Sequence, residues 1–568
     1  HLVAGAVPAS AGQSVRYRAA QAALSGYKDV AAFVQAVEAA DAEADAAWDA
    51  LVRAAPLAAK KPADAAPSLV VRAESNPLEA LGFRNGGTVA TMIDRWVPKA
   101  DGVHGAKRMA ELVPGLITAL AETDDPNGAI ERFDRFLSAA AHDGAIFTAM
   151  NNDPKLIQEV ANVFGNAPAV AESFIRSKRL PREWPTWDLA PDVPVAAADW
   201  IEHNVDLGPH ALSGDALRAW GRDMRAQAAC DVIGGRLEAA EINAVFTAIA
   251  EAMVKRAYDI CTAKHTGRRP DIGVIAMGAL GSRMLAFDDP LELVFVFDGD
   301  PESPAPERTV AAATFASELM NELTGGVDEA APLYRIDLNR RPGGQGGEIA
   351  ASLKAYLSYY GGPASPAEHL ALTRARILAA PEELRLRLET GLRDILTRGR
   401  RPDRLAAEAD RVRHRNARDS DSGNRWDLDA MQGGIGDISL VAAALQLRFS
   451  AEHPYVLSPD PISAFQSLTR AGCLAADTGA ELTETYRFYA RINAILAIAG
   501  RADLGARRPR PLLADLIARA AGVMEFVSVE PLIQGHADRT FAHYKRLFLM
   551  PQPIPMPERR NATFRIRG

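Results

Sequence analysis

Apolar positions recur every three or four residues along most of the chain. Residues 30–54 and 106–121 show this spacing clearly, and it is also present from 212 to 263. After residue 347 the same spacing returns and continues to about residue 550. Because an α-helix has 3.6 residues per turn, this period places the apolar side chains of each segment on one helix face. The pattern therefore predicts that most of the chain is helical.

The pattern changes between residues 273 and 338. Three short, continuous apolar runs occur there, at 273–277, 291–297 and 333–338. They contain β-branched and aromatic residues and are bounded by Gly, Pro and Asp, which is typical of buried strands. Residues 308–323, between the last two runs, have the spacing of a connecting helix. We therefore predict a small mixed sheet and an α+β fold that is mostly α-helical.

Proline-rich stretches indicate where the chain divides. Residues near 55–78 contain KKPADAAPS and have the composition of a linker, and residues 180–194 hold four prolines, which a helix cannot accommodate. The last residues include PQPIPMPERR, which has no core-forming pattern. We predict an N-terminal helical region over 1–195, a central domain with the sheet over 196–345, a C-terminal helical bundle over 346–550 and a proline-rich tail over 551–568.

Charge and cysteine content exclude several classes of function. The formal net charge of −8 provides no broad basic surface, so we expect no nucleic acid partner. No apolar run reaches the roughly 18 to 20 residues that a membrane span needs, so we expect no membrane partner. The three cysteines are far apart and lack CxxC spacing, which predicts no disulfide framework, no zinc site and a reducing, cytoplasmic location. The chain begins with His rather than Met, and we expect it to be part of something longer.

The candidate chemistry lies between residues 277 and 297. A turn with Gly278, Gly281 and Ser282 follows the first apolar run, and Glu292 stands near the start of the second. Nucleotidyltransferases of the DNA polymerase beta superfamily resemble this arrangement: a Gly-Ser turn lets backbone amides approach a triphosphate, and an Asp-x-Asp on the next strand holds Mg²⁺. Residues i and i+2 of a strand face the same side, so both carboxylates reach one ion cluster. Asp337, in the third run, is the candidate for a third carboxylate.

A series of motifs makes the resemblance specific. The chain contains, in order, MGALGSRM, DPLEL, YRIDLNRRPGG, AEHLALTRAR and WDLDAMQGGIGDISL. The glutamine synthetase adenylyltransferase family is similar, with GMGKLGGRE, SDxDL, YxVDxRLRPxG, WExxALxRAR and WDLKxxxGGLxDIEF in the same order. The resemblance covers roughly residues 80–550 and is greatest to the C-terminal, adenylylating half of that family.

The resemblance implies roles for particular residues. Gly278, Gly281, Ser282 and Arg341 would contact the nucleotide, and Glu292 and Asp337 would hold the metal. It further implies ATP and Mg²⁺ as cofactors if the chain is active, and glutamine synthetase and the PII signalling protein as partners. The basic run at 411–418 is instead predicted to be a solvated helix face, because acids flank it on both sides.

The departures from the family motifs fall on the chemistry. Pro290 replaces the first Asp of the strand motif and Glu292 the second, so one metal ligand is lost. Asp289 could substitute only through a bulge at Pro290, which restricts its backbone. Further replacements occur at four positions, Asn339 for Arg, Ala367 for Trp, Asp429 for Lys and Ser439 for Glu. Loss of one electrostatic contact at a reacting centre costs about 10²- to 10³-fold in rate.

Three interpretations of function follow. The first is a divergent family member with a damaged metal site, catalytically impaired, that acts as a regulatory module binding a nucleotide or a protein. The second is a working adenylyltransferase that moves AMP from ATP to a tyrosine of glutamine synthetase, with Glu292, Asp337 and a shifted Asp289 around Mg²⁺. The third is a helical scaffold without a ligand.

Overall fold

The computed structural model describes residues 76–96, 102–139, 145–184, 196–206, 213–265, 271–298, 305–325, 332–419, 426–501, 504 and 508–549. The predicted helix at 30–54, nearly all of the predicted linker and the predicted tail at 551–568 lie outside these residues. The chain divides into two units, one over residues 1–166 and 174–189 and the other over 167–173 and 190–568. The domain boundaries expected from the sequence remain a prediction.

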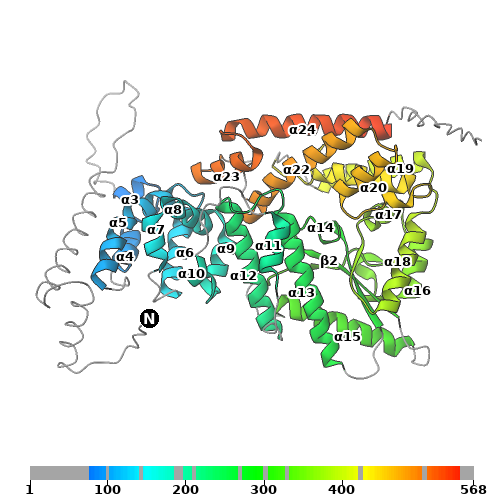
Figure 1. The fold of residues 1–568 in the computed structure, drawn as a ribbon, viewed down its shortest axis with the longest axis horizontal. Helices are drawn as coiled ribbons and strands as arrows, with labels where there is room; N and C mark the ends of the chain where they lie inside the picture. Colours follow the sequence, from blue (N-terminus) through cyan, green and yellow to red (C-terminus); the bar gives the residue numbers. More distant parts are fainter. Residues whose placement is uncertain are drawn as a thin grey trace, which may run out of the picture. The chain divides into compact units, whose positions relative to one another are not determined.

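The first unit is helical throughout its described residues. Its elements are α3 (Pro77–Ala80), α4 (Gly86–Asp94), α5 (Gly102–Ala121), α6 (Pro126–Ala139), α7 (Ala145–Asn152), α8 (Pro154–Ala161), the π-helix η2 (Asn162–Asn166) and α10 (Leu180–Glu183) (Figure 1). Helix α9 (Pro168–Arg176) crosses the division between the units along the chain. Aromatic residues form the core of this unit, with the rings of Phe133 and Phe164 edge to face at 5.4 Å. The indole of Trp184 donates to the buried Glu159 at 2.9 Å, which satisfies both polar groups.

The second unit contains the predicted mixed sheet, which the structure confirms. Its strands are β1 (Asp271–Ala276), β2 (Leu291–Asp298), β3 (Ile336–Asp337), β4 (Ala350–Ser352) and β5 (Arg376–Ala379). The order is β3-β2-β1-β5, and β4 also pairs with β2. Strand β1 is antiparallel to β2 and β5, whereas β3 and β4 are parallel to β2. Almost every residue of β1 and β2 is buried, which explains their continuous apolar runs.

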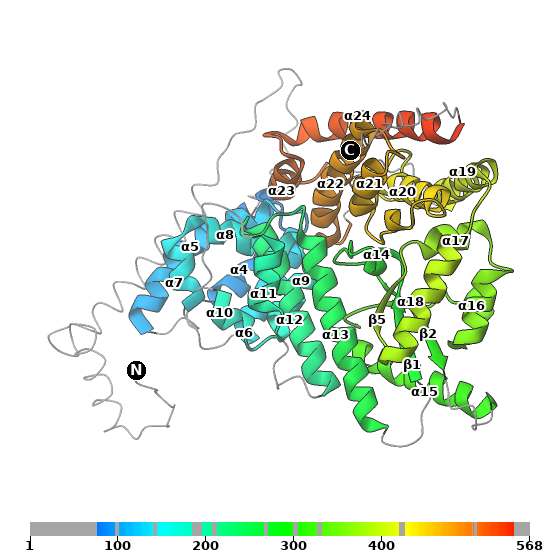
Figure 2. The same cartoon turned by 45° about the vertical axis from the view of Figure 1, so that its right-hand side comes forward.

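Helices precede this sheet in the sequence, connect its strands and pack around it. Helices α11 (Ala197–Asn204), α12 (Gly214–Ile233) and α13 (Ile242–Lys264) precede it, and α15 (Ala305–Thr324) connects β2 to β3. Helices α13, α15, α16 (Leu353–Gly361) and α18 (Glu382–Leu396) pack around the strands (Figure 2). Strands β4 and β5 lie after residue 345, so the sheet continues into the region predicted to be a helical bundle. Strand β3 covers only Ile336 and Asp337 of the run 333–338, and the carbonyl of Leu333 accepts from Arg225 at 2.6 Å.

A helical bundle follows the sheet. It comprises α17 (Pro366–Leu372), α19 (Pro402–Asp419), α20 (Ile435–Phe449), α21 (Pro461–Arg470), α22 (Ala476–Ile498), α23 (Pro511–Ala521) and α24 (Val529–Tyr544), with the short helices η5 (Pro454–Val456), η6 (Phe526–Ser528) and η7 (Lys545–Leu549). Helix α20 is central and contacts α17, α19, α21, α22 and α24. Its residues are buried on several sides, as a central helix requires. Within the described part of the chain, no helix is long and apolar enough to span a membrane.

Candidate nucleotide site

The Gly-Ser turn predicted from the sequence lies directly after β1. Helix α14 (Gly278–Gly281) opens there, and Gly278 has a left-handed φ of +53°. The hydroxyl of the buried Ser282 donates to the carbonyls of Gly278 at 3.0 Å and Ala279 at 3.3 Å, so it closes the turn. A Cβ on Gly281 would collide with the carbonyl of Arg374. Ser282 and Gly281 therefore have structural reasons for their identity. Their predicted contact with a nucleotide stays a prediction.

Glu292 occupies the space above this turn. A Cβ built on Gly278 would overlap the Glu292 carboxylate, which therefore lies directly against the glycine backbone. Glutamate is one methylene longer than the aspartate of the family motif, which gives its carboxylate the additional reach. The position where the resemblance places a triphosphate thus holds a negative charge, and two anions in one site repel each other.

Glu292 and Asp337 face each other across neighbouring strands. They are partners in the register of the parallel pair β2–β3. Glu292 accepts a hydrogen bond from Nε of Arg340 at 2.8 Å, and Asp337 accepts one from the amide of Asn339 at 2.6 Å. Burial alone would lower the pKa of Arg340, but Glu292 and Asp337 raise it overall. Both carboxylates are therefore close together and already engaged by donors of the protein.

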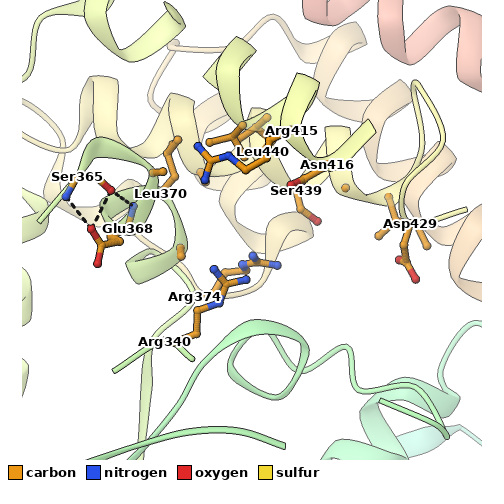
Figure 3. A pocket seen from close by; sticks show the side chains of 16 residues that line it. Arg340, Ser365, Glu368, Leu370, Arg374, Arg415, Asn416, Asp429, Ser439 and Leu440 are labelled. Carbon is orange, nitrogen blue, oxygen red and sulfur yellow. Dashed lines mark hydrogen bonds between the residues drawn. The ribbon is translucent and has the colours of Figure 1, made fainter. Parts of the chain in front are cut away.

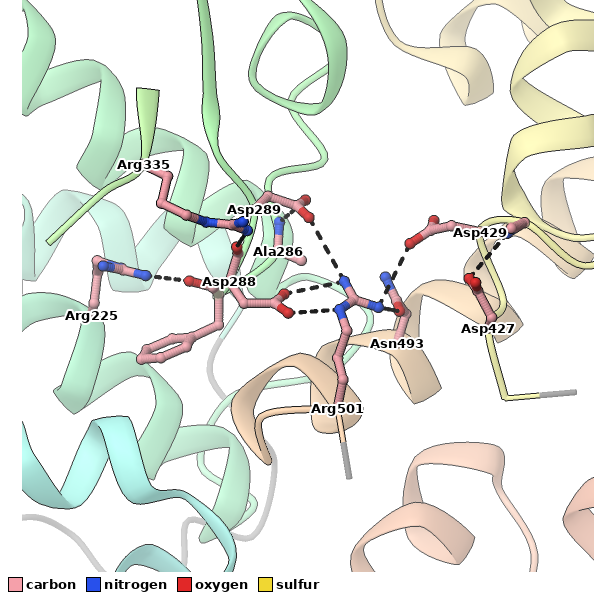
Figure 4. A network of polar contacts seen from close by, with 11 residues as sticks. Arg225, Ala286, Asp288, Asp289, Arg335, Asp427, Asp429, Asn493 and Arg501 are labelled. Carbon is pink, nitrogen blue, oxygen red and sulfur yellow. Dashed lines mark hydrogen bonds and ion pairs between the residues drawn. The ribbon is translucent and has the colours of Figure 1, made fainter. Parts of the chain in front are cut away.

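The acids before Pro290 point toward the helical bundle. The carboxylate of Asp289 accepts from the amide of Ala286 at 2.8 Å. Asp288 forms a two-pronged ion pair with Arg501, at 2.6 and 3.1 Å, and Asp289 lies 3.7 Å from the same guanidinium (Figure 4). Burial raises the pKa of Asp289, and Asp288 adds to this rise, while the amide hydrogen bond opposes it.

The side chains as they lie do not fit a magnesium centre. Mg²⁺ requires several oxygen ligands in near-octahedral geometry. Among the described residues, no group of three or more His, Cys, Asp or Glu side chains is placed to hold a metal ion. Pro290 offers no side-chain oxygen, and the carboxylate of Asp289 already accepts a hydrogen bond from the amide of Ala286 at 2.8 Å. The predicted metal ligands therefore remain a prediction that this arrangement does not support.

Arg341 organises a loop, whereas its neighbour reaches the site. The Arg341 guanidinium donates to three carbonyls, those of Gly347 at 3.0 Å, Leu338 at 3.1 Å and Gln345 at 2.9 Å. This loop contains the short helix η4 (Gly344–Gly346). Nucleotide contact by Arg341 stays a prediction, and Arg340 is the residue in contact with Glu292. Sequence reasoning missed Arg340, because a shift of one residue cannot be seen in a motif match.

A cavity of about 600 Å³ opens beside this site. It is bounded by residues of α17, α19 and α20 together with Arg340 and Arg374 (Figure 3). Three of the positions at which the chain departs from the family motifs line it, namely Ala367, Asp429 and Ser439. Arg415 lies in the run predicted to be a solvated helix face, and it also lines the cavity. The TRAR motif contained Arg374, but its sequence alone carried no signal that this side chain faces a cavity.

Comparisons with known proteins agree with the motif series. Residues 157–390 match the family model described as glutamate-ammonia ligase adenylyltransferase, and residues 404–528 match that of GlnD PII-uridylyltransferase. Similar curated proteins are the bifunctional glutamine synthetase adenylyltransferase/adenylyl-removing enzymes of Rhodopseudomonas palustris (strain BisB5) and Bradyrhizobium diazoefficiens. Each is 28% identical, over 83% of this chain and 49% of the relative. The corresponding enzyme of Xanthobacter autotrophicus is 28% identical over 80% of this chain and 48% of its own length.

The chain spans about half the length of these curated relatives. The matched family models cover the sheet, its flanking helices and most of the helical bundle. The matches to family models thus include both the region that contains the motifs and the helical bundle that follows it in the sequence. Over residues 157–390, which hold all of the sheet, the chain is similar to the glutamine synthetase adenylyltransferase (glutamate-ammonia ligase adenylyltransferase) family.

Proposed function

We propose that this chain is a catalytically impaired member of this family, which acts as a regulatory module by binding a nucleotide or a protein rather than by transferring AMP. The observation that carries the proposal is the position of Glu292. Its carboxylate lies against Gly278 and is bound to Arg340 at 2.8 Å. A carboxylate in that place repels a triphosphate. Its ion pair with the Arg340 guanidinium also weakens it as a metal ligand.

Pro290 and Asp289 support the same conclusion. Pro290 removes one oxygen ligand from the strand, and the carboxylate of Asp289 is engaged by the amide of Ala286. An in-line transfer from ATP depends on ions that bridge the phosphates and activate the attacking hydroxyl. A site that lacks the ligands for these ions should transfer AMP slowly or not at all.

The partners we propose follow from the comparisons. The similar curated proteins are named for acting on glutamine synthetase, and the bundle matches a PII-uridylyltransferase model. We propose glutamine synthetase and a PII-type signalling protein as partners of this chain, in the cytoplasm. ATP is the nucleotide proposed for the site.

A working adenylyltransferase is the second candidate, and one observation favours it. The β2–β3 register keeps Glu292 beside Asp337, as a shared metal site would require. Activity would need Arg340 to release Glu292 and Asp289 to leave the amide of Ala286. It would then move AMP from ATP to a tyrosine of glutamine synthetase.

An AMP-transfer assay separates the two candidates. The chain is incubated with α-³²P-labelled ATP, Mg²⁺ and glutamine synthetase, and label on the synthetase is measured. We expect no label above the level without the chain. Magnesium-dependent labelling by the unaltered chain would show that it is an active enzyme and refute the proposal.

A repaired variant locates the cause. The double substitution Pro290→Asp with Glu292→Asp restores the family motif, and we expect it to raise labelling by at least about 10²-fold, since one electrostatic contact at a reacting centre is worth that much. In the same background, Asp337→Asn should remove the gain. Retention of the unaltered chain on immobilised glutamine synthetase or PII-type protein would identify the proposed partner, and absence of retention together with absence of nucleotide binding favours the scaffold.

A further inference from the structure

The cavity between α17, α19 and α20 contains an unusual concentration of guanidinium groups. Arg340 and Arg374 extend into it from one wall, and Arg415 extends from the opposite wall (Figure 3). Arg340 is paired with Glu292 at 2.8 Å. Among the described residues, the guanidinium groups of Arg374 and Arg415 have neither a hydrogen bond nor an ion pair. The cavity therefore offers donors that the protein itself does not use.

Among these groups, the guanidinium of Arg374 has the greatest need of a hydrogen-bonded partner. The residue is half-buried, and its backbone carbonyl packs against Gly281 at the end of the Gly-Ser turn. Burial lowers the pKa of Arg374, Glu292 partly offsets this, and the neighbouring Arg340 lowers it further. A guanidinium withdrawn from water without a hydrogen-bonded partner is costly, and an anion in the cavity would remove that cost.

The departures from the family motifs favour an anion in this place. Ala367 stands where the motif has Trp, which leaves room in the wall formed by α17. Ser439 stands where the motif has Glu, so the wall formed by α20 carries one negative charge fewer. Ser439 is instead hydrogen-bonded to Tyr486. Both changes affect the same cavity, the first by enlarging it and the second by removing a competing carboxylate.

The carboxylates that remain in the lining are bound by the protein. Glu368 accepts from the amide and hydroxyl of Ser365, both at 2.8 Å, and from the hydroxyl of Tyr359 at 2.5 Å. Asp429 lies 3.7 Å from Arg501, on the side of the cavity away from Glu368 (Figures 3 and 4). Neither of these carboxylates is ion-paired with Arg374 or Arg415. The guanidiniums of Arg374 and Arg415 can therefore use all of their N–H donors to bind a ligand. Arg340 donates in part to Glu292.

We propose that this cavity binds a phosphate-bearing small molecule through the guanidiniums of Arg374, Arg415 and Arg340, without a divalent cation. Guanidinium binds phosphate oxygens with two parallel hydrogen bonds, which a metal-free site requires. A divalent cation would itself be repelled by three arginines. The inference rests on the proposed function, because it identifies what the impaired module binds. A nucleotide and an inorganic polyphosphate share this chemistry, and the volume of about 600 Å³ admits either.

Isothermal titration in EDTA tests the proposal on the full chain. ATP, AMP and tripolyphosphate are titrated separately, then again with Mg²⁺. We expect saturable binding of ATP or tripolyphosphate in EDTA, and Mg²⁺ should weaken it, since Mg²⁺ neutralises the phosphates. Binding of ATP but not tripolyphosphate identifies a nucleotide, and equal binding identifies the phosphate chain. The proposal is wrong if none of the three binds in EDTA or if binding appears only with Mg²⁺.

Matched variants locate the binding in the cavity. Arg374→Gln should weaken binding at least tenfold, whereas Arg411→Gln, on α19 one turn before Arg415 and 68% exposed, should change it less than twofold. Ala367→Trp refills the cavity without altering charge and should block binding, which keeps the test decisive if Arg374→Gln does not fold. Equal affinities for the unaltered chain and the folded cavity variants would place the anion elsewhere and overturn the proposal. Because titration needs no AMP transfer, the outcome is independent of the labelling assay.

Discussion

At the scale of single residues, the additional methylene group of Glu292 brings its carboxylate against the turn that was predicted to contact phosphate. Glu292 reaches Gly278 and Arg340, where the aspartate of the family motif would be shorter. Its charge also lies near Arg374, since it acts on the pKa of that side chain. The same carboxylate therefore covers the turn and partly neutralises the adjoining cavity.

This predicts the effect of Glu292→Gln. Loss of the negative charge should strengthen binding of ATP in EDTA several-fold, because Arg340 and Arg374 no longer share an anion with the protein. The cost in unfolding free energy should be less than about 1 kcal/mol, since the Arg340 side chain is 47% exposed and the pair is screened. Titration and urea unfolding measure the two quantities. Glu389→Gln, an exposed site on α18, is the control, and weaker binding by Glu292→Gln would contradict the prediction.

His536 supplies a second prediction at this scale. Its Nδ1 faces Nη2 of Arg539 at 2.9 Å, and because Arg only donates, Nδ1 must be an unprotonated acceptor. Thr485 also contacts Nδ1, and the ring stacks on Phe488 at 4.2 Å. Burial, with a contribution from Arg539, lowers the pKa of His536 to about 4. The folded protein therefore keeps this imidazole neutral.

The sign of the pH effect follows from linkage. Between the unfolded pKa near 6.5 and the folded pKa near 4, the unfolded chain binds the proton more readily, so stability falls as pH is lowered through that window. The loss should total about 3 kcal/mol, because each tenfold difference in proton affinity between the two states is worth about 1.4 kcal/mol. Urea unfolding at pH 7 and pH 4.5 should show most of it, and His536→Gln should have a correspondingly smaller difference. Equal pH dependence in both proteins would show that His536 does not cause it.

At the scale of elements, Arg225 holds the strands that carry the candidate site. This buried side chain on α12 donates to the carbonyls of Phe287 and Leu333, one before β2 and the other before β3. Its guanidinium also lies over the rings of Phe287 at 4.5 Å and Tyr334 at 4.4 Å. One helix residue thus positions the two segments from which Glu292 and Asp337 extend.

Arg225→Met should therefore be strongly destabilising. It leaves two carbonyls without their donor and removes both ring contacts, and each unsatisfied buried group costs about 1–3 kcal/mol. We expect a loss of about 2–4 kcal/mol in the free energy of unfolding, measured in urea. Lys255→Met, at a site 56% exposed on α13, should cost less than about 0.5 kcal/mol. Equal losses in the two variants would refute an anchoring role for Arg225.

At the scale of the second unit, Arg501 joins the sheet to the helical bundle. It follows α22, has a left-handed φ of 50°, and binds Asp288 through two hydrogen bonds and Asn493 at 3.0 Å. Asp429, where the family motif has Lys, lies 3.7 Å away. Contacts between residues 213 positions apart therefore hold the loop before β2 against the bundle (Figure 4).

Removal of this cation should loosen that loop. In Arg501→Ala, three aspartates near one another lose their counter-ion, and we expect amide hydrogen exchange at residues 284–289 to accelerate at least roughly tenfold, which corresponds to about 1.4 kcal/mol of local stability. Hydrogen exchange with mass spectrometry measures it. Arg508→Ala, at an exposed position, is the control. Unchanged exchange in the Arg501 variant would mean that packing alone holds the loop.

Much of the architecture was determined by the sequence itself. Hydrophobic period predicted the helices and the runs that became β1 and β2, because the side-chain spacing of a helix or a strand is a local property of the chain. The motif series also indicated the family to which the chain is similar, and it placed Glu292 and Asp337 on neighbouring strands. It could equally show that Pro290 carries no metal ligand, since that follows from the residue type alone.

Only the tertiary structure decided how those residues are used. Glu292 meets Arg340 from 48 positions away, Arg341 turns to its own loop instead, and Arg374 and Arg415 reach one cavity from different elements. Side-chain direction and ion pairing depend on distances through space between residues that are remote in sequence. Periodicity and motif spacing contain no such distances, which is why the cavity and its arginines could be found only after the chain was folded.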